Sequence, residues 1–97
     1  MNVRIRTEAE AELEATFDCY EQRQKGLGHR FLDDYLHALR PIAADRWPRD
    51  PLVNDVHGCR IDRFPISVVY RVLGDHCMTI AVAHQNRRPR YWSDRLR

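Results

Sequence analysis

The sequence predicts a single α+β domain, residues 1–97, in the order β-α-α-β-β-β, with a helical hairpin packed on one face of a mostly antiparallel sheet. Two observations lead to this fold class. From Phe64 to His84, alternate positions are apolar on both sides of a Gly74-Asp75 turn, and this period-two pattern is typical of a β-hairpin. Residues 7–25 and 27–40 instead repeat apolar residues at helical spacing.

The first elements are a short strand and a helix. Apolar and polar residues alternate over residues 1–6, which predicts the strand. Thr7 and Glu10 have the spacing of a capping box, in which each side chain bonds the backbone N–H of the other residue. The helix is expected to run to about Lys25, and Gly26 is expected to end it. Its apolar side consists of Ala9, Leu13, Phe17 and Tyr20.

The second helix is predicted to begin between Leu27 and Arg30 and to bury one apolar side. That side consists of Phe31, Leu32, Tyr35, Leu36 and Leu39. Pro41 lacks an N–H and crowds the preceding turn, so a kink or a fresh helical turn is expected over residues 42–45. Residues 47–54 contain two prolines and are predicted to form a loop.

Three further strands follow, the first over residues 56–63 and the other two in the long hairpin. One face of the hairpin's first strand holds Phe64, Ile66, Val68, Tyr70 and Val72. The other face is mixed rather than wholly polar and holds Ser67, Val69, Arg71 and Leu73. After the turn, Met78, Ile80 and Val82 resume the alternation. Pro89 ends regular structure, and residues 91–97 are expected to form a last helical turn.

Cysteine usage and hydropathy indicate a cytosolic protein. Cys19, Cys59 and Cys77 have no paired spacing, so they are interpreted as free thiols in a reducing compartment. No apolar run approaches the roughly 18 residues of a membrane span, and no signal peptide is recognisable. His57 near Cys59 and His76 beside Cys77 have the residue types of metal ligands without the spacing of a zinc site. No metal or cofactor is therefore predicted.

The net charge of +2 conceals an acidic and a basic pole. The acidic residues of the first helix are Glu8, Glu10, Glu12, Glu14, Asp18 and Glu21. The basic residues at the end of the chain are Arg87, Arg88, Arg90, Arg95 and Arg97. A basic end of this kind indicates either an acidic partner or charges that simply keep a small domain soluble.

With these elements in order, the chain resembles the RelE/ParE family of toxins from type II toxin–antitoxin systems. The motifs that carry the resemblance are Glu8–Leu13, Gly26–Gly28 with Arg30–Leu32, Arg63–Pro65, Val69–Val72, Ala81–Gln85 and Tyr91–Trp92. The resemblance covers almost the whole chain. It implies a cytoplasmic toxin neutralised by a cognate antitoxin whose extended tail wraps it, and it allows a homodimer or a heterotetramer with the antitoxin.

Members of this family divide by target, and the resemblance leaves two chemistries to compare. RelE-like members cleave mRNA in the ribosome without metal, and ParE-like members poison DNA gyrase. RNA cleavage without metal needs a base, a cation and an acid, and here His84, Arg87 and Tyr91 have the matching groups. RelE-like nucleases usually place an Arg just before the Val-Tyr of the central strand, where this chain has Ser67, and Lys25 is the single lysine.

The sequence therefore favours a ParE-like toxin that acts by binding gyrase, with a ribosome-dependent mRNA interferase as the alternative. Binding needs only a shaped and charged surface at the end of the central hairpin. The residues assigned to target or antitoxin binding are Arg71, Arg87, Arg88, Arg90 and Trp92. In the alternative, His84, Arg87 and Tyr91 are catalytic.

Overall fold

The computed structural model describes residues 1–46, 52 and 55–96. In this part of the chain four strands form one sheet, and they are β1 (Asn2–Ile5), β2 (Val56–Arg60), β3 (Ile66–Leu73) and β4 (His76–His84). Their spatial order is β1-β4-β3-β2. Strand β1 runs parallel to β4, and the other neighbouring pairs are antiparallel. The predicted α+β fold class, its order of elements and its mostly antiparallel sheet are confirmed.

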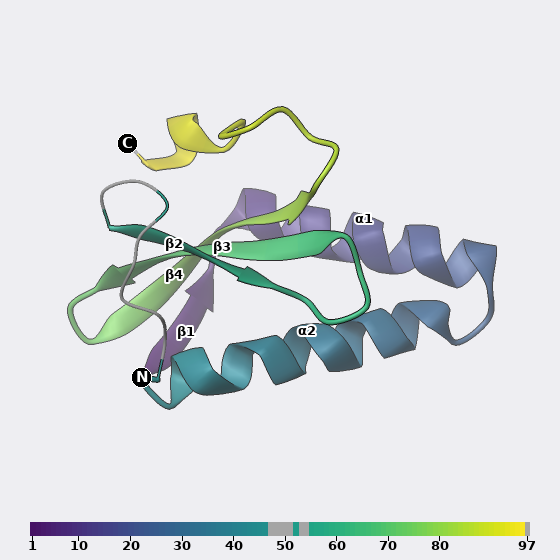
Figure 1. Cartoon of the computed structure of the whole chain (residues 1–97), viewed down its shortest axis with the longest axis horizontal. Coiled ribbons are helices and arrows are strands. Elements are labelled where there is room, and N and C mark those ends of the chain that lie inside the picture. The colour runs from purple at the N-terminus through teal and green to yellow at the C-terminus, as the bar shows by residue number, and fades with distance from the viewer. Residues whose placement is uncertain (47–51, 53–54, 97) are drawn as a thin grey trace.

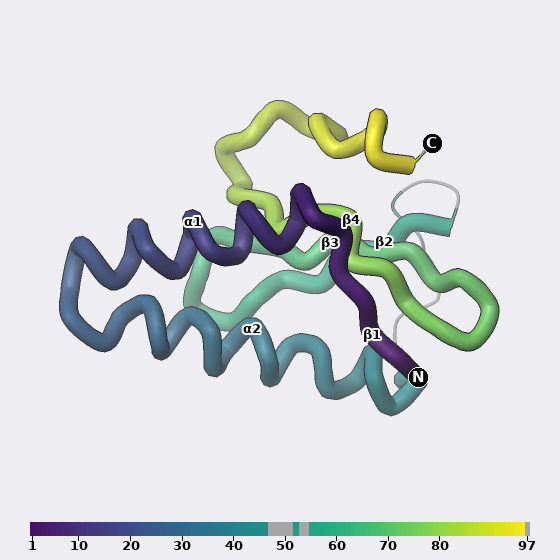
Figure 2. The backbone as a smooth tube through the Cα atoms, turned by 180° about the vertical axis from the view of Figure 1, so that it is seen from behind, coloured from purple at the N-terminus to yellow at the C-terminus, as the bar shows by residue number. Residues whose placement is uncertain are grey.

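The sheet forms the middle of three layers (Figure 1). Helices α1 (Thr7–Arg23) and α2 (Leu27–Ala43) run antiparallel, side by side, along one face of the sheet (Figure 2). The C-terminal segment crosses the other face and ends in a short 3-10 helix, η1 (Ser93–Leu96), close to the predicted last turn. Val68 packs with the helices and its neighbour Val69 packs with Trp92, so both faces of β3 are covered.

Helix α1 begins directly where β1 leaves the sheet. Arg6 is its N-cap, with an extended backbone, and the Arg6 N–H still donates to the Thr79 carbonyl over 3.0 Å. Thr7 is therefore already helical, and no side-chain hydrogen bond caps the helix. The predicted capping box between Thr7 and Glu10 is wrong, because pairing with β4 keeps Arg6 extended and the helix starts one residue earlier than that motif requires.

The link between the helices depends on two glycines. Helix α1 ends at Arg23, two residues before the predicted end, and Gly26 has a left-handed backbone (φ 90°) at the start of α2 rather than at the end of α1. The Glu21 carboxylate accepts the N–H groups of Gly26 and Gly28, each over 2.9 Å. A Cβ at Gly28 would lie 2.7 Å from the Phe17 carbonyl oxygen, so this close approach of the helices requires glycine.

Helix α2 continues through Pro41 and ends at Ala43. The Ala44 N–H donates to the Arg40 carbonyl, and the Asp45 N–H donates to the Ile42 carbonyl, each over 3.0 Å. The Asp45 bond closes a turn over residues 42–45, which continues α2 rather than beginning a new helix, and the kink expected as the alternative stays a prediction. Because Pro41 lies in the last helical turn, its missing N–H removes a single helical hydrogen bond.

The core between the helices and the sheet is aromatic. Phe31 is fully buried, and its ring lies 5.7 Å from the ring of Tyr20 and 5.4 Å from that of Phe64. The buried line of α2 consists of Phe31, Tyr35, Ala38 and Ile42. Leu36 was predicted to join this line, but 53% of it is exposed. One residue along a helix turns the side chain by about 100°, so Leu36 points away from the sheet that Tyr35 faces.

A β-bulge in β4 changes which side chains share a face. Val69 pairs with Ala81 while Tyr70 pairs with Thr79, so Ile80 is an extra residue in the ladder. As a result Ile80 and Ala81 both pack on the side of the C-terminal segment, and Val82 packs with the helices. The predicted single face for Met78, Ile80 and Val82 is wrong, because the bulge shifts the alternation by one residue.

Other sequence predictions fall on the remaining parts of the fold. Strand β2 ends at Arg60, three residues before its predicted end, and the loop predicted at residues 47–54 lies almost wholly outside the described residues. The three thiols are free, as predicted, with Cys19 exposed and Cys77 buried. Among the described residues, no helix has both the length and the apolar character needed to cross a membrane.

Candidate functional site

The predicted site residues gather where the chain leaves β4. A shallow depression of about 290 Å³, here called the basic depression, lies between the end of the hairpin and the C-terminal segment. Six predicted residues line it, namely His84, Arg87, Arg88, Arg90, Tyr91 and Trp92. Arg71, also predicted to bind a partner, lies outside it and donates to the Asp55 carboxylate over 2.9 Å and to the Leu96 carbonyl over 3.3 Å. The structure therefore brings together all but one of the predicted residues.

Backbone hydrogen bonds turn the chain so that its arginines surround the depression. The Gln85 N–H donates to the Pro65 carbonyl over 2.9 Å, which fastens the end of β4 beside the turn before β3. Arg90 has a left-handed backbone (φ 58°), which a non-glycine residue seldom adopts. The Ser93 hydroxyl and N–H both donate to the Arg90 carbonyl, over 2.6 and 2.9 Å, and these bonds hold the reversal in place.

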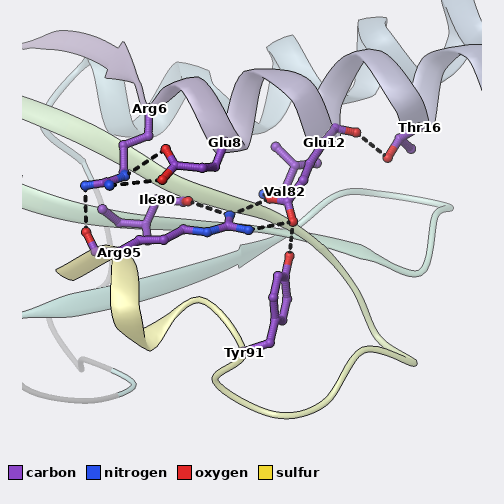
Figure 3. Close-up of polar contacts among 8 residues, drawn as sticks. All are labelled: Arg6, Glu8, Glu12, Thr16, Ile80, Val82, Tyr91 and Arg95. Carbon is purple, nitrogen blue, oxygen red and sulfur yellow. Dashed lines mark hydrogen bonds and ion pairs between the residues drawn. The ribbon is translucent and has the colours of Figure 1, made fainter. Parts of the chain in front are cut away.

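The partly buried carboxylate of Glu12, a residue absent from the predicted site, anchors the C-terminal segment to α1 (Figure 3). Glu12 accepts hydrogen bonds from the Tyr91 hydroxyl over 2.6 Å and from the Arg95 guanidinium over 2.8 and 3.2 Å. It also accepts the Val82 N–H over 3.1 Å. Arg95 donates further to the Ile80 carbonyl over 3.1 Å. Through its three partners, Tyr91, Arg95 and Val82, Glu12 connects α1 with β4 and the C-terminal segment.

The contacts of Glu12 alter its acidity and that of Tyr91 in opposite directions. Burial alone would raise the pKa of the Glu12 carboxyl, but the hydrogen bonds from Arg95, Tyr91 and Val82 outweigh it and hold this pKa below its ordinary value. For Tyr91, burial first, and then the hydrogen bond to the Glu12 anion and its charge, raise the phenol pKa to about 12. Near neutral pH the pair is therefore a phenol donating to a carboxylate.

Two guanidinium groups lie over the Tyr91 ring. The Arg87 guanidinium lies 3.9 Å from the centre of this ring, a cation–π contact, and the Arg95 guanidinium lies 5.2 Å away. No ion pair of Arg87, Arg88 or Arg90 occurs within residues 1–46, 52 and 55–96. These three exposed arginines therefore present positive charge to the solvent, with Arg87 held against an aromatic ring.

His84 occupies the boundary between the basic depression and a second hollow. Its Nδ1 accepts the N–H of Asn86 over 3.0 Å, so the neutral imidazole carries its proton on Nε2. The second hollow, of about 200 Å³, includes Cys19, Arg23 and Ile66 in its lining. In the neutral His84 ring, Nδ1 therefore accepts a backbone hydrogen bond, and Nε2 carries the proton and can act only as a donor.

Trp92 lines the depression from its buried side, whereas Arg71 lies outside it. Trp92 is 5% exposed and packs with Val56, Val69 and Ile80 on the second face of the sheet. Arg71 fastens η1 to β3 through the Leu96 carbonyl. In the described part of the chain, no group of three or more His, Cys, Asp and Glu side chains is placed to hold a metal ion.

One sequence signal could have identified Glu12. It lies three residues after Ala9 and eight before Tyr20, both buried, so helical spacing puts it on the side of α1 that faces the sheet. A carboxylate there needs a partner, because a buried charge without one is costly. Its partners Tyr91 and Arg95 are 79 and 83 residues away in sequence, so local patterns do not reveal them.

Comparison with known proteins adds evidence for the fold. No protein-family profile matches the chain, and no curated protein sequence matches it. Among solved structures, it is similar to a chain of the "Chromosomal ParDE TA system from P. aeruginosa", where TA denotes toxin–antitoxin. The TM-score is 0.72 at 22% sequence identity, over 87% of this chain and 95% of that chain. The likeness at this identity concerns the fold, and the predicted RelE/ParE-like fold is thereby confirmed.

Proposed function

We propose that this chain is a ParE-like toxin of a type II toxin–antitoxin system, acting in the cytoplasm by binding DNA gyrase and neutralised by a cognate antitoxin. The observation that carries the proposal is the fold shared with the ParDE chain over 87% of this one. Fold alone does not determine function, so the surface must agree with it. A basic depression without internal ion pairs, in the described part of the chain, is such a surface.

The contacts of the depression favour binding over catalysis. A general acid near neutral pH needs a proton that it can release, and the Tyr91 phenol has a pKa of about 12 and already donates to Glu12. A general base needs a free lone pair, and His84 Nδ1 accepts the Asn86 N–H. Both groups of the nuclease hypothesis therefore have structural roles in the chain.

The RelE-like alternative, a metal-independent mRNA interferase on the ribosome, rests on one specific observation. His84, Arg87 and Tyr91 line the same depression, so a base, a cation and an acid would all reach one phosphate there. In that case a ribosome-bound mRNA would have to displace the hydrogen bonds of His84 and Tyr91.

Antitoxin binding is proposed for the same surface. Arg87, Arg88 and Arg90 offer charge that an acidic tail would neutralise, and the toxin's target would then be excluded from the depression. Strand β2 is at an edge of the sheet, where an extended chain can add by backbone pairing. Trp92 forms the buried side of this surface, and Arg71, outside the depression, is proposed as a further contact of the partner. A homodimer or a heterotetramer with the antitoxin is compatible with this arrangement.

The test is expression without a partner, followed by purified assays. We expect growth arrest with filamentous cells and induced DNA damage, and inhibition of gyrase supercoiling by the purified chain. Immediate arrest of translation, with mRNA cut on programmed ribosomes and no cleavage by His84→Ala or Tyr91→Phe, would instead establish the interferase. Unimpaired growth on expression would contradict both toxin functions.

A further inference from the structure

The edge of β4 beyond β1 is completed by side chains rather than by a strand. β1 pairs with β4 only as far as Thr79, and the chain then leaves the sheet for α1. Beyond that point the Ile80 carbonyl accepts from Arg95 and the Val82 N–H donates to Glu12. Glu12 is therefore held at a fixed place against the sheet, with its side chain only 16% exposed.

We propose that Glu12 is a positioning residue of the basic depression, which fixes the Tyr91 ring and thereby the place where the charge of Arg87 is presented to a partner. Glu12 itself does not line the depression. It acts through the 2.6 Å bond from the Tyr91 hydroxyl. The Tyr91 ring in turn carries the Arg87 guanidinium at 3.9 Å (Figure 3 for Glu12 and Tyr91).

The contacts from Glu12 to Tyr91 and from Tyr91 to Arg87 each fix the orientation of the next side chain. The phenol is long and narrow, so bonding its oxygen to the partly buried Glu12 carboxylate fixes the far end of the ring while the backbone fixes the near end. Arg95 strengthens the arrangement because it donates to Glu12 and lies 5.2 Å from the same ring. Arg88 and Arg90 have no such platform among the described contacts, so Arg87 is the arginine of the depression whose guanidinium is ordered by the fold.

The position of Arg87 can be measured without knowing the partner. A side-chain N–H above an aromatic ring has an upfield-shifted proton, so the Arg87 Nε–Hε resonance reports the contact with Tyr91. We expect an upfield signal in the wild type, and its loss in Tyr91→Leu defines the unshifted position. In Glu12→Gln the signal should move toward that position, because the charge that orders the phenol and Arg95 is gone. The matched control is Glu10→Gln, the same change at an exposed site of α1, which should leave the signal in place.

A second variant keeps the test decisive if Glu12→Gln does not fold. Tyr91→Phe retains the ring and its packing and removes only the hydroxyl, so the Arg87 signal should shift part of the way. The difference between the ultraviolet titrations of the wild type and Glu12→Gln gives an independent reading, because the change affects the environment of Tyr91 and should lower the pKa of this phenol. An Arg87 signal that is identical in the wild type and in Tyr91→Phe would overturn the inference.

A second experiment, the gyrase assay, rests on the proposed function and is independent of the Arg87 resonance. In the gyrase supercoiling assay, Glu12→Gln should need a concentration roughly fivefold higher than the wild type for half inhibition, which corresponds to about 1 kcal/mol. Glu10→Gln should match the wild type. If wild type and both variants leave gyrase untouched, the proposed target is wrong and the Arg87 resonance alone decides the role of Glu12. If all three inhibit equally, the positioning role is refuted.

Discussion

Replacing Phe31 with alanine tests the packing of the helices on the sheet. Phe31 is fully buried, and three aromatic rings, those of Tyr20, Tyr35 and Phe64, lie within 6.5 Å of its own. Removing a buried phenylalanine side chain costs about 3–5 kcal/mol through lost transfer energy and the cavity it leaves. The three ring contacts place Phe31→Ala toward the upper end of that range.

This loss is large compared with the stability of so small a domain. A domain of 97 residues is expected to have a free energy of unfolding of about 5–15 kcal/mol. In a chain of this size each kcal/mol lowers Tm by roughly 4–8 °C, so Phe31→Ala should lower Tm by about 12–40 °C. Urea denaturation should show a lower midpoint with an unchanged slope.

Leu36→Ala is the matched control on the same helix. Leu36 is 53% exposed, so its truncation should change the free energy of unfolding by less than about 1 kcal/mol. If Phe31→Ala and Leu36→Ala had equal midpoints, α2 would not be docked on the sheet through the side of the helix that contains Phe31.

Three further predictions concern the C-terminal segment. Trp92→Ala should cost about 3–5 kcal/mol in urea denaturation, because Trp92 caps the second apolar face of the sheet, and an unchanged midpoint would contradict that role. Acid should weaken the domain through Glu12: its folded pKa is lowered, so its stabilisation is present above the usual value of 4.5 and is lost as the pH falls from there through the folded pKa. Between pH 7 and pH 3 the wild type should therefore lose more stability than Glu12→Gln, and equal losses would refute the linkage. Reversing Arg87 and Arg88 to glutamate should weaken antitoxin binding, measured by calorimetry at two salt concentrations, and should also weaken growth arrest. The control Arg30→Glu on α2 should leave both unchanged. If the two variants behave alike, the basic end is only a solvated surface.

The elements that sequence reasoning predicted correctly are those with local periodicity. Alternation around Val68 and Tyr70 and helical spacing around Phe31 and Tyr35 each repeat within a few residues, so they can be read without knowing the partner element. The pairing of these elements into a hairpin sheet with helices on one face then follows from burial of their apolar sides. The order of the whole fold was therefore predictable.

The predictions that failed concern which side of an element faces the sheet. Leu32, Tyr35, Leu36 and Leu39 make a wide apolar stripe on α2, and the pattern alone does not say which half faces the sheet. The bulge at Ile80 inserts one residue into an alternating run without any glycine or proline to mark it.

The predicted site residues lie together, apart from Arg71, but the contacts that hold them in place were only partly predictable. His84, Arg87 and Tyr91 are near one another in sequence and follow the end of a strand, so their meeting in one depression was predictable. The role of the Tyr91 hydroxyl, however, depends on its hydrogen bond to Glu12, which is 79 residues away in sequence. Only the tertiary fold reveals that this tyrosine is a bound donor and a platform for an arginine.

The acidic and basic poles of the sequence are partly one structural feature. Glu12 of the acidic helix and Arg95 of the basic end bond to each other at 2.8 Å, with 16% and 17% of their side chains exposed, so neither charge is available to a partner. Of the described arginines at the basic end, those left exposed for binding are Arg87, Arg88 and Arg90. Reversing the charge of Arg95 would therefore weaken the attachment of the C-terminal segment to the sheet, whereas reversing Arg88 changes the surface and leaves that attachment intact. Loss of binding therefore identifies the interaction surface only in variants such as the Arg88 reversal, which leave the C-terminal segment attached.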